Sequence, residues 1–391
     1  MPLAFTSNEQ TDEELNQFRR EVRQFIRQEL TPEIREEMHA EDHIGARAWA
    51  FINKLGERGW ISIGWPERFG GMGKPLAYRL ALWDELAYAG APGNLVANRI
   101  VAPVLMQCAN PDQQAEFLPR IAAETIEFAL GYTEPNAGSD LSAITTTAVL
   151  DGDQYRINGE KMFNTGCHFS HYHWLLARTD RTVPARKSSS LFIVDMDSPG
   201  IELRPLYSIA GERTNAVFYS DVVVPRSRMV GEPNKGFAYL RAALAFERLF
   251  LTGDTVRSIE DLIAYCRANE ELWSDAAVRQ ELAALATDVE VTRQFAFELI
   301  NLQEQERPAR TESSVAKVYS TEAAMRLTRF ALRILGHRGE LIRGSADEAM
   351  HGRMIRQYRR AVGRTIVGGT TEIQLDTIAT GVGLQTGRRT R

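Results

Sequence analysis

Apolar residues recur every three or four positions through the first third of the chain, to about residue 125. The first such face predicts a helix that ends before Pro32, and its members are Leu15, Phe18, Val22, Phe25, Ile26 and Leu30. Further helices are predicted over 46–59, 76–90, 94–107 and 112–124. The segment 59–75 is rich in Gly and Pro, which interrupt helices.

The period of the pattern changes between about residues 126 and 232. Residues 143–163 are rich in Thr and Val, and they contain Asp151-Gly152 and Asn158-Gly159, both strong hairpin-turn signals. Further short strands are predicted over 174–178, 190–196 and 218–225, and 182–190 is expected to be a surface loop. This pattern predicts a small antiparallel barrel or sandwich.

Helical periodicity returns from about Lys235. Candidate helices cover 236–267, 275–306, 311–335, 346–360 and a last segment from Thr371, lengths that suit a bundle. The expected fold is therefore an α+β multidomain chain. We expect an N-terminal α-helical domain over 1–125, a middle antiparallel β-barrel domain over 126–232 and a C-terminal four-helix bundle over 233–391.

Composition narrows the class of protein. The 391 residues include 46 Lys and Arg against 51 Asp and Glu, a formal charge of −5, so a partner held by its phosphates, such as nucleic acid, is not expected. No apolar run is long enough for a membrane span, and the N-terminus has no secretory pattern. The three scattered cysteines (Cys108, Cys167, Cys266) indicate neither a disulfide framework nor a zinc site. A cytoplasmic enzyme is the favoured class.

Two segments of the middle region carry groups that can hold a planar ring. Residues 132–140, Tyr-Thr-Glu-Pro-Asn-Ala-Gly-Ser-Asp, combine a compact turn with hydroxyls and backbone N–H groups, which suit the polar edge of a ring. Residues 161–166, Lys-Met-Phe-Asn-Thr-Gly, place an aromatic next to a hydroxyl, which suits one face and one edge. Each has an ordinary alternative. The first segment could be a domain linker, and Phe163 of the second could lie on the core face of a strand.

Glu247 is a candidate general base. Its helical neighbours three and four positions away are all apolar: Ala243, Leu244, Phe250 and Leu251. No cation of the same helix can pair with it, and partial desolvation raises the pKa of a carboxylate and makes it a better base. The alternative is a buried Glu that pairs with an Arg of another helix.

Two further patterns are weaker. In the segment 368–374, Gly-Gly-Thr-Thr-Glu-Ile-Gln, Thr370 or Thr371 can cap a helix and the glycines admit a ligand, but helix–turn–helix connections often have this composition. His168, His171 and His173 lie close together without a carboxylate or thiol motif beyond Cys167. We expect polar, solvent-facing hairpin positions there, and no metal site.

Together these segments resemble the acyl-CoA dehydrogenase family. Five stretches match family motifs in the family's order over almost the whole chain: 59–71, 133–140, 159–166, 212–225 and 368–374. The resemblance implies noncovalently bound FAD, an acyl-CoA substrate, a trans-2-enoyl-CoA product and an electron-transfer flavoprotein as electron acceptor.

Motif matching implies a role for individual residues. Thr133 and Thr165 would bond the flavin edge, and Phe163 would pack on the ring, where the family usually has Trp. The remaining cofactor positions by this match are Tyr132, Gly138 and Ser139 in the flavin loop and Thr370 and Glu372 on the ribose–adenine side. Ser139 and Arg248 would contact the substrate.

The resemblance also bears on the base. Many members carry a Glu where this chain has Gly368, whereas a subset resembling the isovaleryl and long-chain branches takes its Glu from a Glu-Arg-Leu on the first long C-terminal helix. Residues 247–249 match that second pattern, which favours Glu247. Gly368 would still contribute its backbone N–H to the thioester carbonyl.

Two departures from the family pattern concern assembly. Residues 265–273 lack the Arg-x-x-Phe-Gly segment, and residues 333–339 lack the Gln and Gly-Gly pattern; in the family these contact the FAD pyrophosphate of a neighbouring subunit. We therefore expect either a homo-oligomer or, preferably, a mixed tetramer in which a paralogous chain brings those contacts. Two other functions remain open: a flavin oxidase or monooxygenase on the same fold, and a non-catalytic partner subunit.

Overall fold

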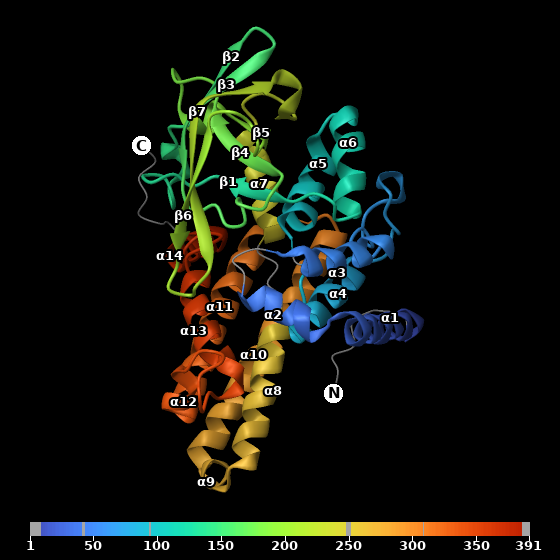
Figure 1. Cartoon of the computed structure of the whole chain (residues 1–391), viewed down its shortest axis with the longest axis vertical. Coiled ribbons are helices and arrows are strands. Elements are labelled where there is room, and N and C mark those ends of the chain that lie inside the picture. Colours follow the sequence, from blue (N-terminus) through green and yellow to red (C-terminus); the bar gives the residue numbers. More distant parts are fainter. Residues whose placement is uncertain (1–8, 41–43, 94, 248–251, 308, 385–391) are drawn as a thin grey trace. The chain divides into compact units, whose positions relative to one another are not determined.

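The computed structural model describes residues 9–40, 44–93, 95–247, 252–307 and 309–384, which divide into two compact units (Figure 1). The first, the helical unit, contains the described parts of 1–31, 75–91 and 248–391. The second, the sheet unit, contains those of 32–74 and 92–247. The middle and C-terminal thirds of the sequence therefore do not correspond simply to these units, because α7 near residue 240 belongs with the sheet.

The sheet unit contains an 8-stranded sheet among its described residues. Its order is β6-β7-β3-β2-β4-β5-β8, and β1 pairs separately with β4. The strands are β1 (Phe128–Gly131), β2 (Thr147–Asp151), β3 (Gln154–Lys161), β4 (Tyr172–Arg178), β5 (Ser189–Asp195), β6 (Ile201–Tyr207), β7 (Arg213–Pro225) and β8 (Met229–Val230). Most neighbours are antiparallel as predicted, but β1 and β2 both run parallel to β4, so the sheet is mixed.

One predicted hairpin turn is present and the other is wrong. The turn at Asp151-Gly152 joins β2 to β3, with Gly152 at a φ of 63°. Asn158 and Gly159 instead lie inside β3, at a register shift where it pairs with β7. Gly159 has a φ of 139°, and a Cβ there would lie 2.7 Å from the Thr146 Cα, so this glycine serves a bulge and a close strand approach. The sequence pattern also missed β1 and β6.

The described part of the sheet unit contains several helices and two apolar cores. The helices are α2 (Pro32–Ala40), α3 (Ala46–Glu57), the π-helical turn η2 (Ala97–Val101), α5 (Ala102–Cys108), α6 (Pro111–Ala122) and α7 (Gly236–Glu247), with short 3-10 turns at Glu67–Phe69, Leu141–Ala143, Ala185–Lys187 and Arg226–Arg228. One of the cores lies between the sheet and the helices η2, α5, α6 and α7. This core includes Val104, Phe117, Phe128, Trp174 and Leu240, all at most 3% exposed. Burial of these large side chains is the main stabilising contribution to this unit.

The helical unit is built on α8, α10 and α11, which run side by side in Figure 1. Its elements are α1 (Glu9–Glu29), α4 (Leu76–Ala89), α8 (Gly253–Ala268), α9 (Glu270–Ser274), α10 (Ala276–Glu304), α11 (Arg310–Leu335), α12 (His337–Glu340), η6 (Met350–Gly352), α13 (Arg353–Arg364) and α14 (Thr371–Gly381). Leu262, Leu282, Leu327, Phe330 and Met354 form the centre of its core.

Two predicted helices of this region differ from the structure. The predicted helix 236–267 is two helices, α7 and α8, separated by 248–251, which lie outside the described residues. The predicted helix 346–360 begins only at Arg353, because Met350, His351 and Gly352 have φ values of 52°, 56° and 64° and cannot continue an α-helix. None of the described helices is long and apolar enough to cross a membrane.

Candidate functional site

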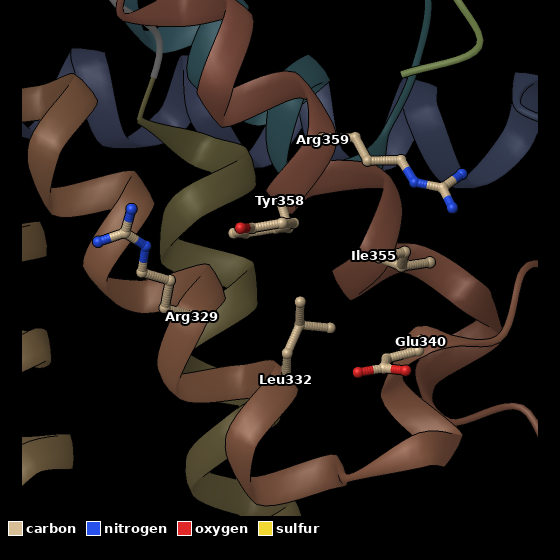
Figure 2. Close-up of a pocket in the computed structure, with 6 residues that line it drawn as sticks. All are labelled: Arg329, Leu332, Glu340, Ile355, Tyr358 and Arg359. Carbon is tan, nitrogen blue, oxygen red and sulfur yellow. The ribbon is translucent and has the colours of Figure 1, made fainter. Parts of the chain in front are cut away.

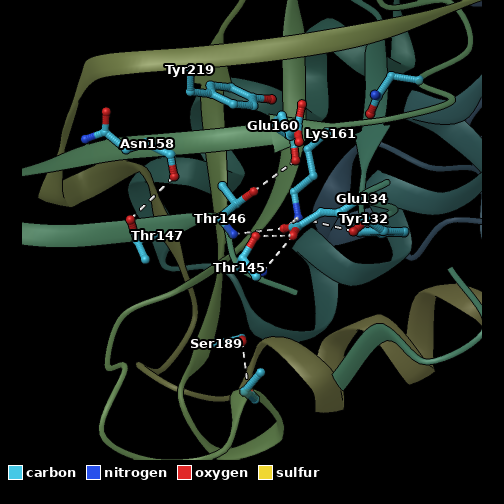
Figure 3. Close-up of polar contacts among 12 residues, drawn as sticks. Tyr132, Glu134, Thr145, Thr146, Thr147, Asn158, Glu160, Lys161, Ser189 and Tyr219 are labelled. Carbon is cyan, nitrogen blue, oxygen red and sulfur yellow. Dashed lines mark hydrogen bonds and ion pairs between the residues drawn. The ribbon is translucent and has the colours of Figure 1, made fainter. Parts of the chain in front are cut away.

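The loop that follows β1 is tied to the end of β3 by a buried ion pair (Figure 3). Lys161 Nζ lies 2.9 Å from Glu134 Oε1 and 3.1 Å from the Tyr132 carbonyl oxygen. The backbone N–H of Met162 donates to the Thr133 carbonyl over 2.8 Å. Three consecutive loop residues are therefore bonded to two consecutive residues at the end of β3, which leaves the Thr133 side chain half-buried beside them.

Glu134 anchors the loop a second time, on the side of Thr145 and Thr146. Its carboxylate accepts hydrogen bonds from the Thr145 N–H, the Thr145 hydroxyl and the Thr146 N–H at 2.6, 2.8 and 3.0 Å. Burial raises the pKa of Glu134, but the Lys161 ammonium and these donors outweigh burial and lower that pKa to about 2. Burial lowers the pKa of Lys161 to about 8, against the opposing effect of Glu134. At neutral pH this is an ionised pair.

Phe163 projects from the segment that follows β3. Its side chain is 65% exposed, so the interpretation of Phe163 as a core-facing residue is wrong. Its φ is 60°, an unusual conformation for a bulky residue, which turns the chain away from the strand direction. Thr165, two residues later, is exposed with its hydroxyl 3.4 Å from that of Thr214. An aromatic face and a hydroxyl are therefore both accessible here.

A buried polar network lies beneath this segment. The Asn164 N–H and side-chain amide both donate to the Asn215 carbonyl, at 2.9 and 3.1 Å, and the Asn215 amide donates to the Asn164 carbonyl at 3.0 Å. His173 Nε2 donates to Asn164 Oδ1 over 3.0 Å, which leaves Nδ1 to accept from the Tyr219 hydroxyl. His173 is fully buried, so the expectation that it faces solvent is wrong. Burial lowers its pKa to about 3, and it is neutral at physiological pH.

The outer part of the first loop is open. Gly138 and Ser139 are exposed, and a Cβ built on Gly138 would meet no atom within 4 Å. Asp140 caps the short turn that follows, accepting from the Ser142 N–H over 3.0 Å. This part of the loop therefore presents backbone and a hydroxyl to whatever approaches it.

The 368–374 segment lies in the helical unit and forms the turn into α14. Gly368 and Gly369 have φ values of 68° and 94°, and Thr370 is the N-cap of α14, as the sequence suggested for Thr370 or Thr371. The buried Gln374 donates to the Gly368 carbonyl over 2.8 Å. The Glu372 side chain is exposed; its own backbone N–H and the Thr370 hydroxyl lower its pKa.

Two oxygens beside this turn are buried without a hydrogen-bond partner among the described residues. They are the Thr371 Oγ1 and the Gln374 Oε1. A buried unpaired acceptor or hydroxyl is unfavourable, and such atoms commonly bond a ligand or an ordered water. These two side-chain oxygens, next to the Gly368-Gly369 turn, are therefore available to bond a ligand.

Glu247 is the last residue of α7, but its side chain lies outside the described residues, as does all of Arg248. The backbone of α7 packs against β5 and η2. The roles of Glu247 and Arg248 therefore stay predictions.

A separate pocket of about 460 Å³ lies in the helical unit between α11, α12 and α13 (Figure 2). Tyr358 and Leu332 face each other across it, with Arg329 on one side and Ile355 and Glu340 on the other. Leu332 and Glu340 directly precede and follow the segment 333–339, which departs from the family pattern. Arg359 completes the lining, so the pocket combines an apolar floor with two cationic groups and one anionic group.

Sequence reasoning missed the residues that support the candidate ligand contacts: Glu134, Lys161, Asn164, His173, Asn215, Lys317 and Gln374. Lys317 is fully buried and donates to the Thr365 carbonyl over 2.9 Å, just before the 368–374 turn. For Glu134, Lys161, Asn164, Asn215 and Gln374 the available signal was a charged or amide residue within a motif, and His173 and Lys317 had no motif signal. Their partners lie up to 51 residues away in the sequence. No cluster of three or more potential metal ligands occurs in the part of the chain that the structure describes.

Comparison with known proteins identifies the family. Profiles of the acyl-CoA dehydrogenase N-terminal, middle and C-terminal domains match residues 12–125, 129–222 and 234–383. The acyl-CoA dehydrogenase FadE26 of Mycobacterium tuberculosis is 34% identical over 340 residues, covering 84% of this chain and 85% of its own length.

Solved structures agree. A structure described as the Tcur3481-Tcur3483 steroid ACAD has a TM-score of 0.90 at 32% identity and covers 98% of this chain and 100% of its own. The ChsE4-ChsE5 complex of Mycobacterium tuberculosis has a TM-score of 0.89 at 32% identity, covering 99% and 100%. The chain thus belongs to the acyl-CoA dehydrogenase family of flavoprotein oxidoreductases.

Proposed function

We propose that this chain binds FAD and oxidises an acyl-CoA thioester to its trans-2-enoyl-CoA, with Glu247 as the base. The observation that carries the proposal is the joined pair of segments in the sheet unit. Thr133 is bonded through its carbonyl to Met162, and the exposed Phe163 and Thr165 follow directly. These are the side chains that the family resemblance assigns to the edge and face of the isoalloxazine ring.

The residues present fit FAD. In the sheet unit, the exposed Phe163 ring, the exposed Thr165 and the half-buried Thr133 are suited to a flat ring with a polar edge. In the helical unit, the unpaired Thr371 Oγ1 and Gln374 Oε1 beside a double-glycine turn match the hydroxyls of a ribose–adenine half. Thr370 and Glu372 would be the remaining contacts on that side. When bound, the flavin supplies a hydride acceptor for the substrate β-hydrogen.

The chain's own residues would activate the substrate. Glu247 would take the α-proton, and the Gly368 N–H would donate to the thioester carbonyl, where negative charge develops as the proton leaves. A backbone donor does not depend on the side chain, so glycine at 368 is compatible with this role. Ser139, in the exposed loop, and Arg248 would contact the substrate.

Assembly with a second chain is part of the proposal. The structures described as Tcur3481-Tcur3483 and ChsE4-ChsE5 each join two different chains, and the former is described as a steroid ACAD. This chain lacks the family's cross-subunit pyrophosphate segments at 265–273 and 333–339. We therefore favour a mixed tetramer with a paralogous chain, a bulky or ring-bearing acyl group as substrate, and an electron-transfer flavoprotein as acceptor.

The test is anaerobic flavin reduction by a panel of acyl-CoA thioesters that includes straight, branched and steroid-ring chains. Glu247→Gln should retain FAD but reduce the rate about 100- to 10,000-fold, the usual contribution of a general base. Glu232→Gln, an exposed glutamate just before α7, is the matched control and should react like wild type. Reduction of Glu247→Gln at the wild-type rate would falsify the assignment.

The same panel separates the alternative functions. A flavin oxidase or monooxygenase would reoxidise rapidly in air after reduction. A non-catalytic subunit would give a mixed assembly whose flavin reduction is unchanged by Glu247→Gln. Slow reoxidation in air together with rapid reoxidation by an electron-transfer flavoprotein supports the dehydrogenase.

A further inference from the structure

Thr133 lies between two residues that bond the same buried ammonium group. Lys161 Nζ contacts the Tyr132 carbonyl on one side of Thr133 and the Glu134 carboxylate on the other, at 3.1 and 2.9 Å (Figure 3). A third bond joins the same two segments, because the Met162 backbone N–H donates to the Thr133 carbonyl over 2.8 Å. The position of Thr133 relative to the end of β3 is thus set by three directional bonds.

An ion pair is an expensive way to join two segments if stability is the only requirement. Lys161 is fully buried and the Glu134 side chain is 3% exposed, so both charges have lost their hydration. Apolar side chains of similar volume often stabilise such a position as well or better. Directional bonds, unlike apolar contacts, fix the spacing and orientation of the groups that they join. Glu134 is further immobilised by its three bonds to Thr145 and Thr146.

The segment that Lys161 begins is fixed at its other end too. Asn164 makes three backbone and amide hydrogen bonds with Asn215. Phe163 lies between these two fixed points with a φ of 60° and an exposed side chain. An unfavourable backbone conformation persists only where the surrounding contacts determine it, and such residues concentrate at functional sites.

We infer that Lys161 is a positioning residue, whose bonds to Tyr132 and Glu134 hold the Thr133 hydroxyl in register with Phe163 and Thr165 for one planar ligand. The inference rests on the proposed function, in which that ligand is the isoalloxazine ring of FAD. Lys161 is buried under the loop and acts through it, without a contact of its own to the ring.

The test uses FAD binding by the apoprotein of the full chain, co-purified with its partner chain where one is required. Lys161→Met keeps the length and apolar stem of the side chain and removes the ammonium. Its affinity for FAD, measured per folded molecule by quenching of flavin fluorescence, should fall about tenfold, the equivalent of one well-placed hydrogen bond. The visible absorption bands of any bound flavin should also lose the wild-type fine structure, because the hydrogen bonds at the ring edge change.

A double variant separates positioning from stability. Lys161→Met/Glu134→Gln has no unpaired buried charge, so it should regain part of the stability lost in Lys161→Met, although the Gln amide accepts fewer of the Thr145 and Thr146 hydrogen bonds. It still lacks the bridge to the Tyr132 carbonyl, so its FAD affinity should stay about tenfold low. If Lys161→Met does not fold, the FAD affinity of the double variant tests the inference in its place. Glu37→Gln is the matched control, because Glu37 is a buried carboxylate of the same unit that accepts a hydrogen bond from the Ala48 backbone N–H over 2.8 Å. This substitution should leave FAD binding unchanged.

The outcomes are distinguishable. Wild-type affinity and spectrum in Lys161→Met, or recovery of affinity together with stability in the double variant, overturn the inference and leave the proposed function standing. Failure of the wild-type chain to bind FAD, alone and with a partner chain, overturns the proposed function and the inference together.

Discussion

Replacement of Phe163 by glycine should separate the stability of the apoprotein from its affinity for FAD. The Phe163 backbone has a φ of 60°, and its ring is 65% exposed. Glycine adopts this conformation freely, whereas a residue with a Cβ does not. The substitution therefore relieves an unfavourable conformation and removes a ring that contributes little to the core.

The expected change in the free energy of unfolding follows from three contributions. Relief of the left-handed conformation stabilises by about 1–2 kcal/mol. Loss of the buried third of the ring costs about 0.5–1 kcal/mol, scaled from full burial of a Phe side chain. Greater freedom of glycine in the unfolded chain costs a further 0.4–1 kcal/mol, roughly. These contributions nearly cancel, so the stability should remain within about 1 kcal/mol of wild type.

Urea unfolding of apoproteins measures this change. The matched comparison is Phe192→Ala, because Phe192 on β5 is fully buried in the core of the same sheet and should lose about 3–5 kcal/mol. FAD affinity should show the reverse order: weakened by Phe163→Gly and nearly unchanged per folded molecule in Phe192→Ala. A loss above about 2 kcal/mol in Phe163→Gly would refute this reasoning, because it would mean that the ring stabilises the apoprotein as a core residue does.

Three further predictions concern the supporting groups and the assembly. The pKa of His173 is about 3 in the folded chain and about 6.5 in the unfolded chain, so the free energy of unfolding should fall as the pH drops from about 6.5 to about 3. The urea midpoint of His173→Gln should depend less on pH over this range than that of wild type. Glu134 has a pKa of about 2 in the folded chain and about 4.5 in the unfolded chain, so its contribution to stability should be lost gradually as the pH falls from about 4.5 to about 2. The stability difference between wild type and Glu134→Gln should shrink over the same range. Co-expression with a paralogue that carries an Arg-x-x-Phe-Gly segment should raise the flavin content measured by absorbance; full occupancy of the chain by itself would contradict the need for a partner.

The sequence by itself determined the order of the elements and the location of the candidate ligand contacts. Helical periodicity predicted α1, α10 and α11 closely, because an amphipathic helix repeats its apolar face over a few neighbouring residues. The motifs at 133–140, 159–166 and 368–374 indicated the family, because their glycines and hydroxyls are contiguous in sequence. A local pattern failed where a neighbouring strand decided the outcome, as at Gly159, whose dipeptide resembles a turn but lies in a bulge against Thr146.

Tertiary structure alone decided which residues support these contacts. Lys161 and Glu134 are 27 residues apart, and nothing in the local pattern shows that either charge is buried. His173 lies in a histidine-rich, polar stretch that suggests solvent exposure. It is nevertheless enclosed, because β4 lies inside the sheet and the Tyr219 ring stacks on His173 from β7, which is separated from β4 by β3 and β2 in the strand order. The physical reason is that a charged or polar side chain becomes favourable in the interior only when its partners arrive from distant segments, and those partners meet only when the sheet has formed.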